Sequence, residues 1–114
     1  MGAPLYTRAS AAATTGGTSG PLNMGASTAL AVGVTVSAAS GTSPKLTLLV
    51  EWQGSDGAWY QLWKATQVTA AGATVTTIGA GCATAEAVPG TIRLRWAVSG
   101  TTPSFTFSAS VLAI

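Results

Sequence analysis

The sequence contains no histidine, one cysteine and only three acidic residues, Glu51, Asp56 and Glu86. Enzymes that act near neutral pH need groups that exchange protons there, bind a metal, or serve as a nucleophile beside a base. Without histidine, the many serines and threonines have no imidazole base, and no G-x-S-x-G nucleophile turn occurs. The three carboxylates are not expected to converge as a glycosidase pair requires. We therefore predict no catalytic residues and no enzymatic activity.

The lone cysteine, Cys82, excludes an intramolecular disulfide, and with no imidazole or second thiol it indicates no recognisable metal site. We expect Cys82 to be a small filler in apolar surroundings. The GAG run at 79–81 lacks both the spacing of a phosphate-binding loop and a helix after it. The sequence therefore predicts neither a metal nor another cofactor.

Charge of either sign is scarce, with five Lys and Arg residues and three acids among 114 residues. About a quarter of the residues in an ordinary soluble domain are charged. The net charge of +2 comes from scattered residues rather than a basic cluster, so we predict no nucleic-acid partner. A surface so poor in charge favours a domain that is covered by neighbours in an assembly. The alternative is a monomer that hydroxyl side chains keep in solution.

Long apolar runs are also missing, because Thr, Ser and Gly interrupt each hydrophobic stretch well before the 18 residues that a membrane-spanning helix needs. The N-terminus, MGAPLYTRASAAATTGG, lacks the basic start and the continuous apolar run of a signal peptide. We expect no membrane association.

The dominant pattern is alternation of apolar and small polar residues, which has the period of two that is typical of strands with one buried face. Four inward rows follow from it: Leu30, Val32, Val34 and Val36; Leu46, Leu48, Val50 and Trp52; Ile92, Leu94, Trp96 and Val98; Phe105, Phe107, Ala109 and Val111. Turn motifs separate the strands: SGTSP at 40–44, GSDG at 54–57, TAAGA at 69–73 and SGTTPS at 99–104. The run at 79–90 is loop-like.

A further strand is expected between the second and third of these turns, over residues 58–68. The alternation puts Tyr60 and Leu62 on its inward face, and Trp59 and Trp63 together on its outward face. Residues 74–78 form a short β-branched strand that is typical of a sheet edge. Six or seven short strands with such turns predict an all-β domain, an antiparallel β-sandwich that is jelly-roll-like or immunoglobulin-like.

The first 25 residues differ from the rest, because they are rich in Gly, Ala and Ser and show no sustained alternation. We predict an extended N-terminal arm over residues 1–25, ordered mainly by a neighbour, and a β-sandwich domain over residues 26–114. The alternative is a frayed end with one edge strand around residues 5–11.

Candidate binding residues come from both regions, and we expect them to form a partner interface. Trp59 and Trp63 favour either interface anchors or a stacking platform for a sugar. Arg93 and Arg95, two apart on one strand, could pair with carboxylates of a partner or guard a strand edge. The remaining candidates lie in the arm: Leu5, Tyr6 and Arg8.

The order of several segments resembles small structural proteins encoded in the head-gene regions of tailed bacteriophages. These segments are TSGPLNMG, SGTSPKLTLLVEWQGSDGAW, QVTAAG, RLRW and GTTPSFTFS, and they span nearly the whole chain. The resemblance implies a β-sandwich decoration or cement protein that is made in the host cytoplasm and binds the outer capsid surface of the virion. It also implies that the major capsid protein is the partner, and that the chain is a homo-oligomer, a trimer or dimer.

Two other functions stay open. One is a carbohydrate-binding or host-attachment module of a phage fibre, using Trp59 and Trp63, and the other is a tail or baseplate component.

Overall fold

The computed structural model describes residues 3–24, 29–79 and 90–113, and every regular element in these ranges is a β-strand. All pairings between the strands are antiparallel. This confirms the predicted all-β, antiparallel sandwich. The strands are β1 (Ala3–Ala13), β2 (Gly17–Thr18), β3 (Leu22–Asn23), β4 (Ala29–Gln53), β5 (Trp59–Lys64), β6 (Gly72–Gly79) and β7 (Thr91–Ala113). Among the described residues, no helix is long and apolar enough to cross a membrane.

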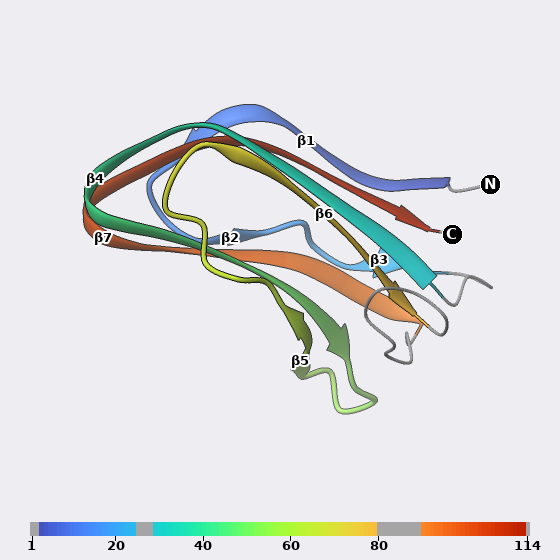
Figure 1. Ribbon diagram of the computed structural model, residues 1–114. Coiled ribbons are helices and arrows are strands. Elements are labelled where there is room, and N and C mark those ends of the chain that lie inside the picture. Colours follow the sequence, from blue (N-terminus) through green and yellow to red (C-terminus); the bar gives the residue numbers. More distant parts are fainter. Residues whose placement is uncertain (1–2, 25–28, 80–89, 114) are drawn as a thin grey trace.

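The sandwich is one sheet folded over on itself, because β4 and β7 pair with each other along almost their whole lengths and bend together (Figure 1). The upper layer contains β1, residues 104–113 of β7, residues 29–40 of β4, and β6. The lower layer contains β2 and β3, residues 91–99 of β7, residues 45–53 of β4, and β5. Two strands of 25 and 23 residues therefore belong to both layers.

The bend lies at SGTSP and SGTTPS, and the prediction that turns separate the strands at these two motifs is wrong. The two motifs face each other across the ladder, and each strand continues beyond its motif. Gly41 and Gly100 take φ values of 109° and 121°, which a side chain would make unfavourable. A Cβ on Gly41 would lie 2.7 Å from the carbonyl oxygen of Thr102, and one on Gly100 would lie 2.8 Å from that of Ser43. The two glycines therefore allow β4 and β7, which both have bulges here, to bend together while their backbones stay in close contact.

The N-terminal segment is extended, and it pairs with β7 of its own chain. β1 runs antiparallel to residues 105–113 of β7, and β2 and β3 run along residues 91–96 of the same strand. Between β2 and β3, the Ser19 backbone N–H donates to the Leu94 carbonyl, and the Ser19 hydroxyl accepts from the Leu94 N–H. The described part of residues 1–25 thus lies along an edge of both layers, whereas the alternative expected one edge strand around residues 5–11; the division into an arm and a domain stays a prediction.

The core lies between the layers and is built from the predicted inward rows. Its largest fully buried side chains include Phe105 and Phe107 of β7, and each aromatic ring buried this way contributes about 1.5–3 kcal/mol. Other predicted core residues are also buried: Leu30, Val32, Val34, Leu46, Leu48, Val50, Ile92, Leu94 and Trp96. Leu62 is half-buried against this core, but Tyr60 is 42% exposed, so its core assignment was wrong.

The two ends of the described chain lie side by side, at the end of the sandwich opposite the bend (Figure 1). Ala3 of β1 and Ala113 of β7 are direct partners in the ladder.

Candidate functional site

The outer face of the lower layer collects most of the charged side chains. Register places Glu51 of β4 beside Arg93 of β7, and Leu49 of β4 beside both Arg95 of β7 and Lys64 of β5. Because neighbouring residues in a ladder share a face, these side chains all point away from the core. We call this surface the basic face; it comprises Lys45, Leu49, Glu51, Trp59, Gln61, Lys64, Arg93 and Arg95.

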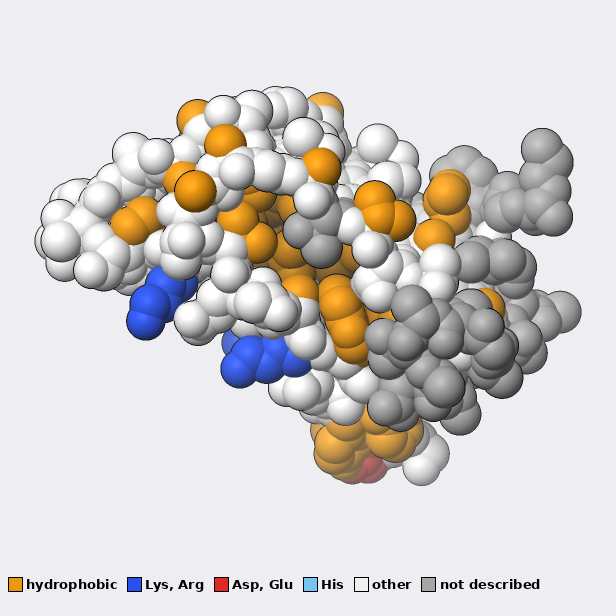
Figure 2. Space-filling view, viewed as in Figure 1, with side chains coloured by type: hydrophobic (Ala, Val, Ile, Leu, Met, Phe, Trp, Pro, Cys, Tyr) orange, Lys and Arg blue, Asp and Glu red, His pale blue; other side chains and the backbone are white. Residues whose placement is uncertain are grey.

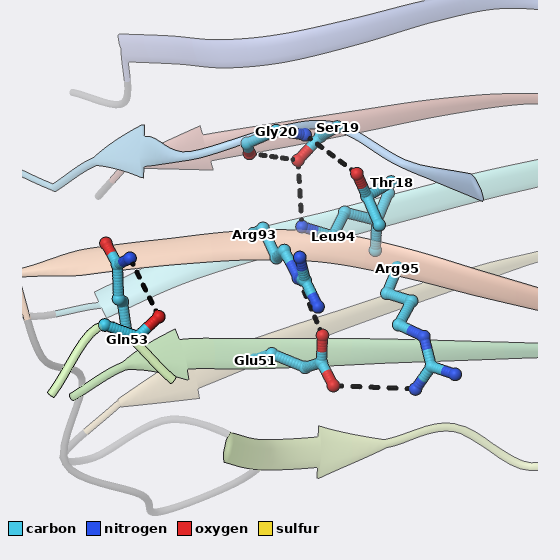
Figure 3. Close-up of polar contacts among 9 residues, drawn as sticks. Thr18, Ser19, Gly20, Glu51, Gln53, Arg93, Leu94 and Arg95 are labelled. Carbon is cyan, nitrogen blue, oxygen red and sulfur yellow. Dashed lines mark hydrogen bonds and ion pairs between the residues drawn. The ribbon is translucent and has the colours of Figure 1, made fainter. Parts of the chain in front are cut away.

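A carboxylate joins two arginines at the centre of the basic face (Figure 3). Arg93 Nε donates to Glu51 Oε1 over 2.7 Å, and Arg95 Nη1 lies 3.5 Å from Glu51 Oε2. The side chain of Glu51 is 9% exposed, that of Arg93 is 23% exposed and that of Arg95 is 45% exposed. One negative charge faces two positive ones, so the cluster keeps an excess of positive charge, which Arg95 carries closest to solvent.

Trp59 lies on this same face, where the guanidinium carbon of Arg93 is 4.4 Å from the centre of its ring. Such a cation–π contact favours the ring and the guanidinium staying together. Arg93 is therefore held from two sides, by Glu51 and by Trp59. Its main role is to order the basic face, whereas Arg95 extends outward from it.

Trp63 lies on the opposite face of β5 from Trp59, so the predicted pairing of the two rings on one face is wrong. The reason is a bulge: Val50 pairs with Trp63 while the next residue, Glu51, pairs with Gln61. One extra residue in β5 reverses the alternation at this point. Trp63 consequently packs against the core, and no platform of two tryptophans forms.

Two lysines complete the basic face without balancing acids. Lys64 and Lys45 are both exposed, and neither forms an ion pair with a described residue. Between the long side chains, Leu49 is buried although it is not part of the core cluster. The basic face thus has four cations around one carboxylate. Alternation placed Leu49 and Glu51 outward, but no local pattern indicated that both would be buried there.

The second described carboxylate, Asp56, is used inside the β4–β5 hairpin. The Tyr60 hydroxyl donates to Asp56 Oδ2 over 2.6 Å, and the Ala58 N–H donates to Oδ1 over 3.0 Å. The hydrogen bond from Tyr60 is the main reason that the pKa of Asp56 is lowered, and the bond from the Ala58 N–H adds to it. The same contact with Asp56 raises the pKa of Tyr60. Tyr60 also stacks on Trp52 with the ring centres 4.9 Å apart. Asp56 therefore holds the hairpin tip together.

The three N-terminal candidates contact their own chain. The Nη1 of Arg8 donates to the Phe107 carbonyl over 2.6 Å and to the Ala11 carbonyl over 3.0 Å, and its guanidinium carbon is 4.0 Å from the Phe107 ring centre. Leu5 and Tyr6 are half-buried against the core. Arg8 therefore closes one side of the sandwich, where a β1 bulge lets it turn inward.

One open depression lies between β6 and the chain that leads to it from β5. Its volume is ≈ 530 Å³, and Trp63, Val68, Val75 and several Ala and Thr residues line it. Its lining includes no charged side chain. This depression was not predicted, because it depends on the bulge that turns Trp63 toward it.

The described part of the chain offers little for acid–base or metal chemistry. Glu51 and Asp56 are both held by neighbours, and no group of three potential metal ligands occurs among the described residues. Cys82, Glu86 and most of the loop expected at 79–90 lie outside the described residues.

No family model matches the sequence, and no curated protein matches it. Solved structures do share the fold. The chain is similar to the PBSX exported protein XepA, with 17% identity and a TM-score of 0.59 over 100% of this chain and 37% of that one. It is also similar to a chain of the T13 IBDV viral particle, with 18% identity and a TM-score of 0.50 over 95% of this chain and 30% of that one.

A third similar structure is a CBM4 protein, with 11% identity and a TM-score of 0.51 over 80% of this chain and 56% of that one. The chain therefore spans roughly a third to a half of the length of these structures. At such identities the similarity shows a shared β-sandwich fold.

Proposed function

We propose that this chain is a non-enzymatic structural virion protein, which decorates the outer surface of a tailed-phage head and stabilises it. The order of its sequence segments resembles phage head proteins of this kind. Its fold is also found in a chain of the T13 IBDV viral particle. Neither the resemblance nor the shared fold identifies the attachment surface.

The observation that carries the proposal is the unbalanced basic face. Lys45, Lys64 and Arg95 present positive charge outward, while the one carboxylate among them, Glu51, is already shared by two arginines. A partner with carboxylates at its surface complements such a face and aligns it. We expect that partner to be the major capsid protein, with the basic face turned toward the shell.

Attachment to several capsid subunits at once would supply the stabilisation. Each single contact has a low affinity. When one rigid body makes several contacts at once, the first raises the effective concentration for the next, so the overall affinity exceeds that of any single contact. A homo-oligomer of this chain, a trimer or dimer, would multiply the number of contacts again.

The test is to compare heads that lack the protein with heads to which it has been added back. We expect added protein to raise the melting temperature of the shell, and Lys45→Glu with Lys64→Glu to abolish that increase. Both lysines are exposed, so the double variant should fold normally, which its own thermal unfolding verifies. The control for position is Leu112→Glu, which adds a negative charge to the exposed outer face of the upper layer, away from the basic face.

Binding to heads should also weaken steeply as salt rises, since exposed charges are screened. Unchanged melting of the shell would contradict the proposal, and recovery of the protein with tails would assign it to the tail or baseplate instead. Equal loss of binding in the control would show that the basic face is not the attachment surface.

A second candidate, a glycan-binding or host-attachment module, is favoured by the uncharged depression at Trp63. An aromatic ring beside neutral polar side chains such as Gln67 and Thr66 suits a sugar. Replacing these two polar residues with Ala should reduce retention on immobilised glycans while the core remains intact. Equal retention of this variant and the wild type would exclude the depression as a sugar site.

A further inference from the structure

The edges of the two layers differ in how they are protected against pairing with another chain. β1 has two irregularities in its register and a proline, β2 and β3 are two residues long, and β5 contains a bulge and ends at Lys64. Bulges, prolines, lysines and short strands are the usual ways in which proteins blunt sheet edges. These edges are therefore unsuitable for adding a strand.

The remaining edge, β6, has none of these features. It pairs with β4 through eight consecutive residue pairs without a shift, and it contains no charge and no proline. On its other side, no strand of the described chain pairs with it. An edge of this length, regularity and neutrality is a template for another strand.

Val75, in the middle of β6, is the most exposed of the large hydrophobic residues that the structure describes, at 76%. Ala73 lies on the same outer side of the strand and is also exposed. The neighbouring outer surface of the upper layer is lined by Gly33 of β4 and small hydroxyl residues such as Ser110 of β7, and its one charged residue, Arg8, donates to carbonyls of its own chain. Figure 2 agrees with this, since the basic side chains visible in that view lie along the underside and none lies on top.

We propose that β6 pairs antiparallel with β6 of a second copy of this chain, with Val75 on the two-fold axis. An uncharged strand is complementary to itself, whereas two basic faces brought together would oppose like charges. Residues that lie directly opposite each other in a ladder point to the same face of the sheet. With Val75 opposite Val75, the two valine side chains contact each other on the outer face, and the most exposed apolar side chain becomes buried. The upper layers of two copies then form one continuous sheet.

This contact concerns how copies meet one another, and it stands whether or not the basic face binds a phage head. A single added strand pair makes a small interface, so the dimer is expected to be weak in free solution. On a surface that already holds many copies, the same contact would link neighbours at high effective concentration.

The register can be tested with single cysteines in a Cys82→Ser background, which removes the natural thiol. Val75→Cys puts two thiols directly across the axis, where a disulfide can form under mild oxidation. Ala73→Cys is the matched control, because its two copies would be about 13 Å apart along the strands. We expect a covalent dimer on a non-reducing gel for Val75→Cys and at least tenfold less for Ala73→Cys. Equal cross-linking of the two variants, or none in either, would overturn the proposal.

A charge exchange tests the same contact without oxidation. Val75→Lys and Val75→Glu should each sediment as a monomer at concentrations where the wild type is partly dimeric, and an equimolar mixture should restore the dimer. Leu112→Lys, which changes another exposed apolar residue of the upper layer away from this edge, should leave the dimer intact. A wild type that stays monomeric at every concentration, or a mixture that fails to associate, would overturn the proposal even if the protein still binds heads.

Discussion

The carboxylate of Glu51 determines how two arginines are arranged on the outside of this sandwich. It accepts from Arg93 at 2.7 Å and lies 3.5 Å from Arg95, and it is nearly buried although it faces outward. Arg93 in turn lies against Trp59. Without the carboxylate, two guanidinium groups on the same strand would repel each other, and Arg93 would lose its charged acceptor.

We predict that Glu51→Gln lowers the free energy of unfolding by about 1–3 kcal/mol, the usual cost of leaving a buried polar partner unsatisfied. Urea denaturation measures this loss of unfolding free energy. If the slope of the unfolding free energy against urea concentration is the same in the variant and the wild type, the substitution has not changed the unfolded state. Gln61→Ala on the same face is the control, and it should change stability by less than about 0.5 kcal/mol because Gln61 is exposed. A loss as small as that of the control would mean that the carboxylate does not organise the face.

The hydrogen bond between Tyr60 and Asp56 makes the hairpin tip sensitive to pH from both sides. The pKa of Asp56 is lowered from its ordinary 3.8, so its contribution is present above that value and is lost as pH falls through the lower folded value. The pKa of Tyr60 is raised from 10.0, so its contribution is present below 10.0 and is lost as pH rises through the higher folded value.

Replacing Tyr60 with Phe should therefore raise the pKa of Asp56 toward its ordinary value, though not fully, because the Ala58 N–H still donates to the carboxylate. Titration of the carboxyl carbon by NMR measures the shift. The reciprocal variant, Asp56→Asn, should lower the pKa of Tyr60. If the pKa of Asp56 is the same in the Phe variant, the hydroxyl is not its main partner.

At the scale of the elements, the decisive feature is the corner where β4 and β7 bend together. Turn-forming residues commonly mark chain reversals, so SGTSP and SGTTPS were predicted as turns. Local sequence does not say that two such motifs lie opposite each other, and this contact is what makes a shared bend instead of two hairpins. The inward rows on either side were predictable because the alternation of large and small residues is local, and burial follows from it.

The bulge in β5 escaped prediction for a similar reason. Strict alternation assigned Trp63 to the outside, whereas one extra residue in β5 opposite β4 turns it toward the core. Tyr60 keeps the register of the inward-facing Trp52, but it lies next to the hairpin tip and is exposed there. The basic residues were predictable as outward-facing from the alternation of β7. Their shared partner, Glu51, lies 42 residues from Arg93 in the sequence, and that long-range register was not predictable.

We predict that Gly41→Ala destabilises the protein by at least about 2 kcal/mol, because it adds both backbone strain and a Cβ only 2.7 Å from a carbonyl oxygen. The matched control is Gly57→Ala in the hairpin tip, which also has a positive φ but has open space around it. Its cost should be about 1 kcal/mol, from strain alone. Thermal or urea unfolding compares them, and equal losses would show that close packing at the corner is unimportant.

At the scale of the whole molecule, two strands run through both layers, so we expect the two layers to unfold together. All four tryptophans lie in the lower layer, in residues 52–63 and at Trp96, whereas the backbone signal of circular dichroism comes from both layers. Because of this distribution, the unfolding of the lower layer can be compared with that of the whole sandwich without attached labels.

We predict that tryptophan fluorescence and far-ultraviolet circular dichroism report the same unfolding transition, with the same midpoint in urea. Coincident transitions are the signature of a single cooperative unit. A fluorescence change that precedes the dichroism change would show that the lower layer unfolds by itself, and would contradict the coupling through β4 and β7.

The pairing of Ala3 with Ala113 has a practical consequence for engineering. Cα atoms of direct partners in an antiparallel ladder are about 5 Å apart, so a short linker could join the two ends. New ends could then be opened at the exposed hairpin tip around Ser55, giving a circularly permuted chain with the same sandwich. For the same reason, the native chain could be inserted as a domain into a surface loop of another protein, because its two closely spaced ends would fit the two ends of the opened loop.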